Sequence, residues 1–360
     1  MRYRSIVTGL LLVGLLAGAC GPPAASPSPP LSTGNAPPAP ATSAPADPLA
    51  PLPPLPGKVT VSYSSVSGSF VPLYLAADLG LFTKHGLDVD VTYIASGTTS
   101  MQSLIAGDLQ FIVTSGAEPA AAYVAGAPTR IVLGWLHALS ALFLVDPSIT
   151  RPEQLRGKTI GITRFGGQPH VAARLALTAW GLDPATDVQY LQLGGTPEIL
   201  AAMQQGAVVG GAFAPPTNVR GQRLGFRVLG DLTQMGIPYQ SGVLVALQPY
   251  LEANPEVTKR FVRAMLEGIK VSLTDDDATR TAMARFTRVD DVDLLDETIR
   301  FYRAAVQKVP YPTIEGLQTV LNDLAENDPR ARTIRPQEFI NTTALEQLER
   351  EGVIRALYGE

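Results

Sequence analysis

Short segments rich in serine, threonine and glycine follow several predicted strands, and their chemistry is hydrogen bonding to a small molecule. Hydroxyl groups and glycine backbone let a ligand come close to the chain. The first turn of a following helix adds unpaired N–H groups and a partial positive potential. Simple N-capping would use the same residues, so each segment has a purely structural alternative. The candidate contacts in the first third of the chain are Ser67, Gly68, Ser69, Phe70, Ser96, Gly97, Thr98, Ser115 and Gly116.

Residues 163–168 form a similar segment that also carries a cation and an aromatic ring. An arginine guanidinium can bind a carboxylate or sulfonate through two parallel hydrogen bonds, although it can equally form a salt bridge at the rim of a site. The glycine pair in this segment permits close approach of a ligand to the backbone. The candidate contacts are Arg164, Phe165, Gly166, Gly167 and Gln168.

Six further residues lie near predicted strand ends or where the chain passes between its two halves. Trp135 could stack on a ligand ring or fill the core, and Asn218 could reach a ligand or complete a turn. The aromatic rings among the candidates favour an organic ligand over a bare inorganic ion. The six residues are Trp135, His137, Pro215, Asn218, Tyr239 and Gln240.

Motifs for catalysis or metal binding do not emerge from the sequence. It contains no Gly-x-Ser-x-Gly elbow, no Walker loop and no Gly-x-Gly-x-x-Gly run. The three histidines do not have a metal-ligand spacing, and Cys20 is the one cysteine. We therefore expect no metal, no cofactor and no enzymatic activity.

The first twenty residues have the pattern of an export signal. Arg2 and Arg4 precede an apolar stretch, residues 5–16, and the small residues 17–19 stand directly before Cys20. This pattern predicts a signal peptide over residues 1–19 and a lipid on Cys20, which would anchor the protein outside the bacterial cell membrane. Cleavage of an ordinary secreted protein is the alternative.

Residues 20–56 are predicted to be a disordered tether, because residues 21–56 hold 14 of the 31 prolines and Asp47 as their one charged residue. The remaining 300 or so residues are enough for two lobes. Without Arg2 and Arg4 the chain has 26 basic residues against 32 acidic residues, a net charge of −6. This charge argues against a nucleic-acid partner, and we expect a monomer.

Strands and helices alternate along the globular part, which indicates α/β lobes with doubly wound, mostly parallel sheets. Apolar residues alternate in the first two strand segments, and Gly86, Gly107, Gly181 and Gly206 follow predicted helices. The predicted strands are 58–64, 87–93, 109–114, 130–136, 158–163, 188–193, 209–214, 226–230 and 242–247. The predicted helices are 70–84, 98–106, 115–125, 168–180, 197–205 and 217–224, followed by a helical block after residue 255.

The domain boundaries follow from two extended segments, residues 141–146 and 242–247. If they lie side by side, the chain crosses to a second lobe and returns there. Lobe one then comprises residues 57–141 plus 244–360, with the helical C-terminal block on it, and lobe two comprises residues 142–243. A cleft between such lobes is the expected ligand position.

Three segments resemble one family of transport proteins. They are residues 72–89 (PLYLAADLGLFTKHGLDV), Gly97 with residues 104–111 (LIAGDLQF), and residues 155–161 (LRGKTIG). They resemble the substrate-binding proteins of ABC importers, in the nitrate/sulfonate/taurine and thiamine-pyrimidine-precursor binding family. The resemblance covers nearly all of residues 57–360.

The resemblance implies a two-lobed type II periplasmic-binding-protein fold that closes around a small-molecule solute. It implies an ABC permease and its ATPase as partners and an extracytoplasmic location. We expect a small organic solute, anionic or heterocyclic and aromatic. A ligand-binding sensor subunit and an exported enzyme on the same scaffold remain as alternatives.

Overall fold

The computed structural model describes residues 47–359, which belong to one compact unit beginning at Asp47. The predicted signal peptide, Cys20 and the tether up to residue 46 lie outside the described residues. Within residues 47–359, no helix is long and apolar enough to cross a membrane.

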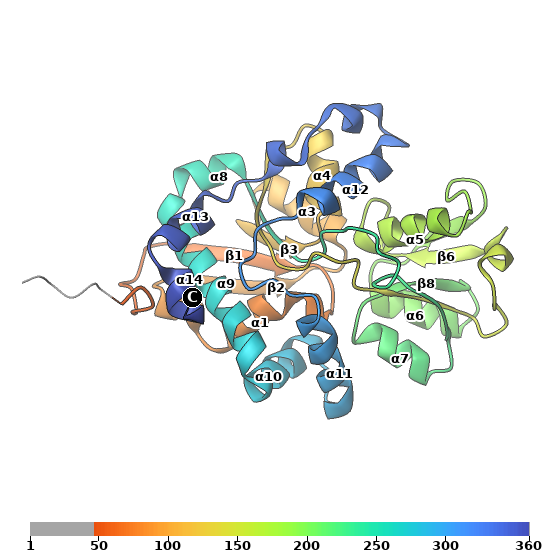
Figure 1. Ribbon diagram of the computed structural model, residues 1–360, viewed down its shortest axis with the longest axis horizontal. Coiled ribbons are helices and arrows are strands. Elements are labelled where there is room, and N and C mark those ends of the chain that lie inside the picture. Colours follow the sequence, from red (N-terminus) through yellow and green to blue (C-terminus); the bar gives the residue numbers. More distant parts are fainter. Residues whose placement is uncertain (1–46, 360) are drawn as a thin grey trace, which may run out of the picture. The chain divides into compact units, whose positions relative to one another are not determined.

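Lobe one is built on a five-stranded mixed sheet (Figure 1). Its strands, in spatial order, are β2 (Asp88–Tyr93), β1 (Lys58–Tyr63), β3 (Phe111–Thr114), β10 (Val243–Leu247) and β4 (Thr129–Gly134). Strands β2, β1 and β3 are parallel, whereas β10 is antiparallel to both β3 and β4. The predicted, mostly parallel sheet is therefore confirmed, and β10 is its one antiparallel strand.

Alternating side chains along these strands bury both faces of the sheet. Val61 and Phe111 belong to the core that contains helices α1 (Val71–Asp78) and α9 (Pro255–Thr274). Ile112 and Val245 belong to the core on the other face, with α3 (Gly97–Ala106) and α4 (Ala117–Val124). Helices α1, α3 and α4 follow the parallel strands β1, β2 and β3, so they begin at the end of the sheet where these strands finish, whereas α8 (Gln248–Ala253) and α9 follow the antiparallel β10.

The predicted single helix over residues 70–84 is wrong. The chain forms a short 3-10 helix, η1 (Gly68–Phe70), then α1 and a separate α2 (Leu81–Lys84). Gly80 separates the two α-helices with a φ of 65°, a left-handed conformation that glycine adopts without a steric penalty.

Lobe two is built on a second five-stranded sheet. Its strands are β7 (Gln189–Gln192), β6 (Thr159–Ile162), β8 (Gly210–Phe213), β5 (Leu142–Val145) and β9 (Arg227–Asp231). Strand β5 is antiparallel to β8 and β9. The helices are α5 (Gln168–Ala179), α6 (Thr196–Gln204) and α7 (Thr217–Arg223), with the 3-10 helix η2 (Pro152–Leu155).

The expected pairing of residues 141–146 with residues 242–247 is wrong, because β5 lies in the second sheet and β10 in the first. The two connections between the lobes run side by side instead. The Ser241 N–H donates to the Leu136 carbonyl (2.8 Å), and the Leu232 N–H donates to the Ala141 carbonyl (3.0 Å). The lobe boundaries at residues 141 and 244 remain our proposed division.

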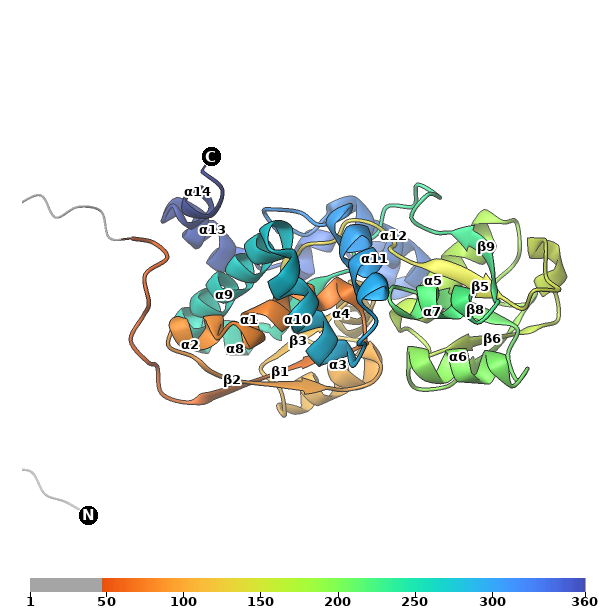
Figure 2. The same cartoon turned by 90° about the horizontal axis from the view of Figure 1, so that it is seen from below.

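Helices from residue 248 onward cover lobe one (Figures 1 and 2). Helix α9 packs on α1 so closely that a Cβ at Gly268 would lie 2.4 Å from the Pro72 carbonyl oxygen. Helix α12 (Ile314–Ala325) contacts both α4 of lobe one and α5 of lobe two. The other members of the block are α8 (Gln248–Ala253), α10 (Asp276–Thr287), α11 (Val292–Arg303), η3 (Pro329–Thr333), η4 (Pro336–Phe339), α13 (Thr343–Arg350) and α14 (Val353–Tyr358).

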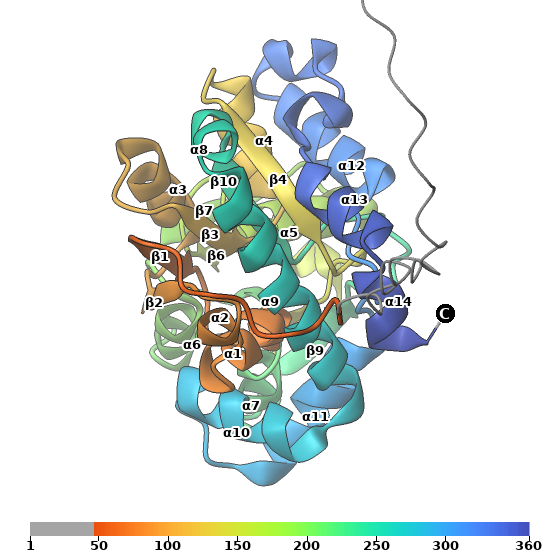
Figure 3. The same cartoon turned by 90° about the vertical axis from the view of Figure 1, so that its left-hand side faces the viewer.

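The end of the proline-rich segment packs against lobe one, although the sequence predicted a disordered tether up to residue 56. Residues 47–56, which we call the strap, run along α2 and α9 (Figure 3). The Leu52 N–H donates to the Lys84 carbonyl (2.9 Å), the Leu55 N–H donates to the Gly86 carbonyl (2.8 Å), and Arg260 donates to the Pro53 carbonyl. The strap is therefore part of the folded unit.

Candidate functional site

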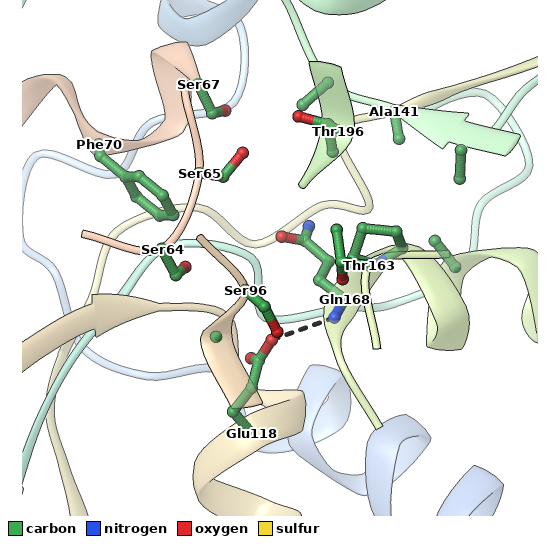
Figure 4. Close-up of a pocket in the computed structure, with 15 residues that line it drawn as sticks. Ser64, Ser65, Ser67, Phe70, Ser96, Glu118, Ala141, Thr163, Gln168 and Thr196 are labelled. Carbon is green, nitrogen blue, oxygen red and sulfur yellow. Dashed lines mark hydrogen bonds between the residues drawn. The ribbon is translucent and has the colours of Figure 1, made fainter. Parts of the chain in front are cut away.

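A narrow cleft lies between the two lobes, at the ends of parallel strands from both sheets (Figure 4). Lobe one contributes the loop after β1, helix η1 and the starts of α3 and α4. Lobe two contributes the loop after β6, the starts of α5 and α6, and the end of β8. The lining residues are Ser64, Ser65, Ser67, Phe70, Ser96, Gly97, Glu118, Ala141, Thr163, Gln168, Pro169, Ala172, Thr196, Ala212 and Ala214.

Glu118 supplies the one charged side chain of this cleft lining. It lies in the first turn of α4 and is only 5% exposed. Its Oε2 accepts a hydrogen bond from the Ser115 hydroxyl (2.6 Å), and its Oε1 accepts one from the Gln168 N–H (3.1 Å) in the other lobe. Burial raises the pKa of Glu118, and these hydrogen bonds offset part of that increase.

Two hydroxyl groups in the cleft have no hydrogen-bond partner. They are Ser96 Oγ in lobe one and Thr163 Oγ1 in lobe two, and the residues are 2% and 5% exposed. A buried hydroxyl without a partner costs free energy, so such groups are ready to bind polar atoms of a ligand. Ser96 also has a φ of 78°, which is unusual for a residue with a side chain.

The start of α3 leaves room for Glu118 because residue 97 is a glycine. A Cβ at Gly97 would lie 2.4 Å from both Glu118 Oε1 and Thr114 Oγ1. The Ser64 hydroxyl donates to Thr114 Oγ1 (3.2 Å), which ties the ends of β1 and β3 together below the cleft. The start of α3 and the ends of β1 and β3 therefore surround the Glu118 carboxylate and fix its position.

Direct contacts join the lobes around the cleft. The Gly68 N–H donates to the Pro215 carbonyl (3.0 Å), and the Thr98 hydroxyl donates to the Phe165 carbonyl (3.4 Å). Arg174 of α5 pairs with Asp323 of α12 through a contact of 2.8 Å. The volume left inside the cleft is about 40 Å³, which is room for a few water molecules. The structure is therefore closed, and a larger solute requires the lobes to separate.

Five of the residues predicted as ligand contacts line the cleft. These residues lie at η1, at the start of α3 and at the start of α5. These residues are Ser67, Phe70, Ser96, Gly97 and Gln168.

A second group of predicted residues lies beside the cleft, mostly in contacts between the lobes. Arg164 is exposed, and its Nε donates to Thr99 Oγ1 (3.2 Å), so its charge lies outside the lining. Phe165 is 52% exposed and packs edge-on against His170. The group comprises Gly68, Ser69, Thr98, Arg164, Phe165, Gly166, Gly167 and Pro215.

A third group is used inside the protein. Trp135 is fully buried and its indole N–H donates to the Ser69 carbonyl (2.8 Å), so it has the core role that the sequence left open. Asn218 Oδ1 accepts from the Val219 N–H (2.6 Å). His137 bonds to the Tyr311 carbonyl and lines a separate groove. The group also includes Ser115, Gly116, Tyr239 and Gln240, all of which are buried.

Ten lining residues were not among the predicted contacts, although Thr163 begins the candidate segment 163–168. Most are small side chains that carry no recognisable signal, but Glu118 is different. An acidic residue in a first helical turn usually indicates a favourable interaction with the helix dipole at the surface. The apolar run that surrounds it, AEPAAAYV, was the available sign of burial. The ten are Ser64, Ser65, Glu118, Ala141, Thr163, Pro169, Ala172, Thr196, Ala212 and Ala214.

Two mixed α/β lobes with a polar cleft between them define the class of the protein. It has the two-lobed fold of periplasmic binding proteins, as in the substrate-binding proteins of ABC-type import systems. Comparison with solved structures agrees. The chain is similar to the aliphatic sulphonate binding protein SsuA from Escherichia coli, with a TM-score of 0.63, 19% identity, and coverage of 80% of this chain and 92% of that chain. It is also similar to the nitrate-binding protein NrtA from Synechocystis PCC 6803, with a TM-score of 0.63, 14% identity, and coverage of 85% and 89%.

Residues 67–279 match the profile described as "NMT1/THI5 like", and the chain belongs to this family. A curated relative is the riboflavin-binding protein RibY of Chloroflexus aurantiacus, which is 27% identical over 320 residues, 84% of this chain and 86% of that protein. Another is the putative binding protein YtlA of Bacillus subtilis, which is 25% identical over 283 residues, 75% of this chain and 84% of that protein. The family predicted from the sequence is thereby confirmed.

No group of three or more potential metal-ligating side chains occurs in residues 47–359.

Proposed function

We propose that the protein captures a small heterocyclic organic solute between its lobes and delivers it to the permease and ATPase of an ABC importer. We further propose that it works outside the cell membrane, held there by a lipid on Cys20. The observation that supports capture is a closed cleft with unpartnered hydroxyls from both lobes, Ser96 and Thr163. Because one of these hydroxyls lies on each lobe, a single bound molecule that contacts both lobes satisfies both groups at once.

The walls of the cleft favour an organic molecule. Phe70 covers one side, and Ala141 lies on the opposite side (Figure 4). Pro169 and Ala172 add further apolar surface to the lining. No lysine, arginine or histidine contributes to the lining. The similarity to a protein named for riboflavin binding supports a heterocyclic solute as well. The lining therefore offers no cationic side chain to neutralise the charge of a small inorganic anion.

The chain crossings provide the hinge for opening. Two antiparallel segments, residues 135–141 and 232–242, connect the lobes. Separation of the lobes would break the contacts between Gly68 and Pro215 and between Thr98 and Phe165. A solute shifts this equilibrium toward closure only by as much as it prefers the closed form.

A thermal-shift screen tests the proposed function, because binding to the native state raises the melting temperature. Riboflavin, an aminopyrimidine, nitrate, taurine and 4-hydroxybenzoate would be compared at equal concentrations. Ala214→Trp places a large ring in the cleft at a partly exposed position. Ala185→Trp, on the exposed surface of lobe two, is the matched control.

We expect a heterocyclic compound to stabilise the wild type and Ala185→Trp but not Ala214→Trp. Absence of a shift with every compound would contradict the proposed function, as would an equal shift in Ala214→Trp. The anchor is tested separately. Cys20→Ser should move the exported protein from the membrane fraction to the soluble fraction.

A further inference from the structure

We propose that Glu118 of lobe one caps the N-terminus of helix α5 in lobe two, and that this cap holds the lobes closed. We call the hydrogen bond between Glu118 Oε1 and the Gln168 N–H the interlobe cap. The inference rests on the proposed function and adds to it a positioning residue that sets the balance between the open and closed forms.

Helix α5 begins in lobe two without a side-chain cap of its own. Its N-cap residue is Gly167, which has no side chain to accept a hydrogen bond, and its first turn contains no acidic residue. The Gly167 N–H donates to the Arg164 carbonyl (3.2 Å), and the His170 N–H donates to the Gly167 carbonyl (3.0 Å). Pro169 has no N–H. Within this part of the chain, the Gln168 N–H is therefore the one donor that needs a partner from elsewhere.

Lobe one supplies that partner from the first turn of α4. Glu118 Oε1 accepts the Gln168 N–H at 3.1 Å, the contact drawn as a dashed line in Figure 4. A carboxylate at a helix N-terminus gains both from this charge-assisted hydrogen bond and from the positive potential of the helix. Both gains are lost when the lobes separate, because donor and acceptor belong to different lobes.

The remaining contacts of the carboxylate come from lobe one and persist in either form. The Ser115 hydroxyl donates to Oε2 (2.6 Å), and the Thr114 hydroxyl and the N–H of Glu118 itself also donate to the carboxylate. These donors hold the side chain in the position that meets α5. Since they and the Gln168 N–H occupy the acceptor sites, a solute binds beside the carboxylate and not to it. The interlobe cap therefore acts on closure and not on the choice of solute.

The test measures the distance between the lobes without any solute. Spin labels are attached to Gln102→Cys on α3 of lobe one and Ala201→Cys on α6 of lobe two, which are both exposed positions. The full chain also carries Cys20→Ser, because Cys20 is its one native cysteine. Pulsed electron–electron resonance then gives the populations of short and long distances, which correspond to closed and open forms.

Two variants remove the interlobe cap, one from each side. Glu118→Ala removes the acceptor, and Gln168→Pro removes the donor. Proline suits the first position of a helix, and the preceding Gly167 is extended (φ −79°, ψ 160°), as a residue before proline needs to be. Gln168→Ala is the matched control, since it keeps the N–H and loses only the side chain. Glu118→Gln is the conservative variant, since it keeps an acceptor oxygen. Melting temperatures confirm that each variant is folded.

We expect the wild type and Gln168→Ala to populate mainly the short distance. Glu118→Ala and Gln168→Pro should each lower the ratio of closed to open molecules at least about tenfold, and Glu118→Gln should retain more of the closed form than Glu118→Ala. Glu118→Ala with Gln168→Pro should open no further than either single variant, because each change removes the same contact.

Unchanged distances in Glu118→Ala or in Gln168→Pro would overturn the inference, and so would equal opening in Gln168→Ala. A wild type that shows only the long distance would overturn it as well, because the interlobe cap would then be too weak to hold the lobes. These outcomes are independent of solute capture. Failure of every compound in the thermal-shift screen would contradict the proposed function, whereas the distances test the interlobe cap by themselves.

Discussion

Arg174 is expected to control the balance between the open and closed forms. Its side chain, on α5 of lobe two, is almost fully buried and contacts Asp323 of α12 (2.8 Å) and Glu326, which directly follows α12 (2.7 Å). Helix α12 packs on lobe one, so this ion pair exists only while the lobes are together. Arg174→Met would leave Asp323 buried without a counter-ion in the closed form, whereas opening would return the carboxylate to water.

The size of the effect follows from burial. Removal of one partner from a buried pair costs about 3–5 kcal/mol. Glu326 is half exposed and contributes little, and burial already raises the pKa of Asp323, which can take up a proton when Arg174 is lost. We therefore estimate about 2–3 kcal/mol, or a loss of roughly 30-fold to 150-fold in solute affinity.

Calorimetry with the solute that gives the largest thermal shift measures this loss, and small-angle scattering without solute measures opening. The double variant Arg174→Met with Asp323→Leu removes both charges and should recover most of the affinity. The loss in Arg174→Met should also be smaller at pH 5 than at pH 8, because protonated Asp323 needs no counter-ion. Unchanged affinity together with an unchanged radius of gyration would refute the reasoning.

Two further predictions concern stability. Burial lowers the pKa of His170 to about 4, and its Nδ1 accepts the Gly166 N–H, so stability is lost as the pH falls from about 6.5 toward 4. His170→Asn keeps a hydrogen-bond acceptor but does not titrate. Between pH 7 and pH 5, its free energy of unfolding should therefore fall by about 2 kcal/mol less than that of the wild type, as measured by denaturant unfolding. Parallel pH profiles of the two proteins would contradict this. A chain beginning at residue 57 should be about 2 kcal/mol less stable than one beginning at residue 47, because it lacks the strap. Equal denaturation midpoints would show that the strap contributes nothing.

Local sequence patterns predicted most strands and helices because their cause is local. In a strand, Val59 and Val61 face one side of the sheet and the residues between and beside them face the other side. Glycines such as Gly107 end helices because they readily adopt a left-handed conformation. The break at Gly80 was missed because an apolar helical period continues across it. The predicted pairing of residues 141–146 with residues 242–247 was wrong for a different reason. Strand partners are chosen by tertiary packing, which neither segment encodes by itself.

The candidate site was harder to predict than the fold. Serine and glycine loops after parallel strands do reach the cleft, as Ser67 and Ser96 show. Whether a side chain points into the cleft or across it depends on how the two lobes meet, and Arg164 is the example. Glu118 was missed because an acidic residue in a first helical turn is ordinarily exposed, and the apolar run around it was the one local sign of burial.

A crystal structure with the most stabilising solute tests the central claim directly. We predict electron density for the solute between Ser96 and Thr163, covered by Phe70. Density confined to another groove, such as the one beside Arg220 and Arg288, would contradict the assignment of the cleft as the solute site.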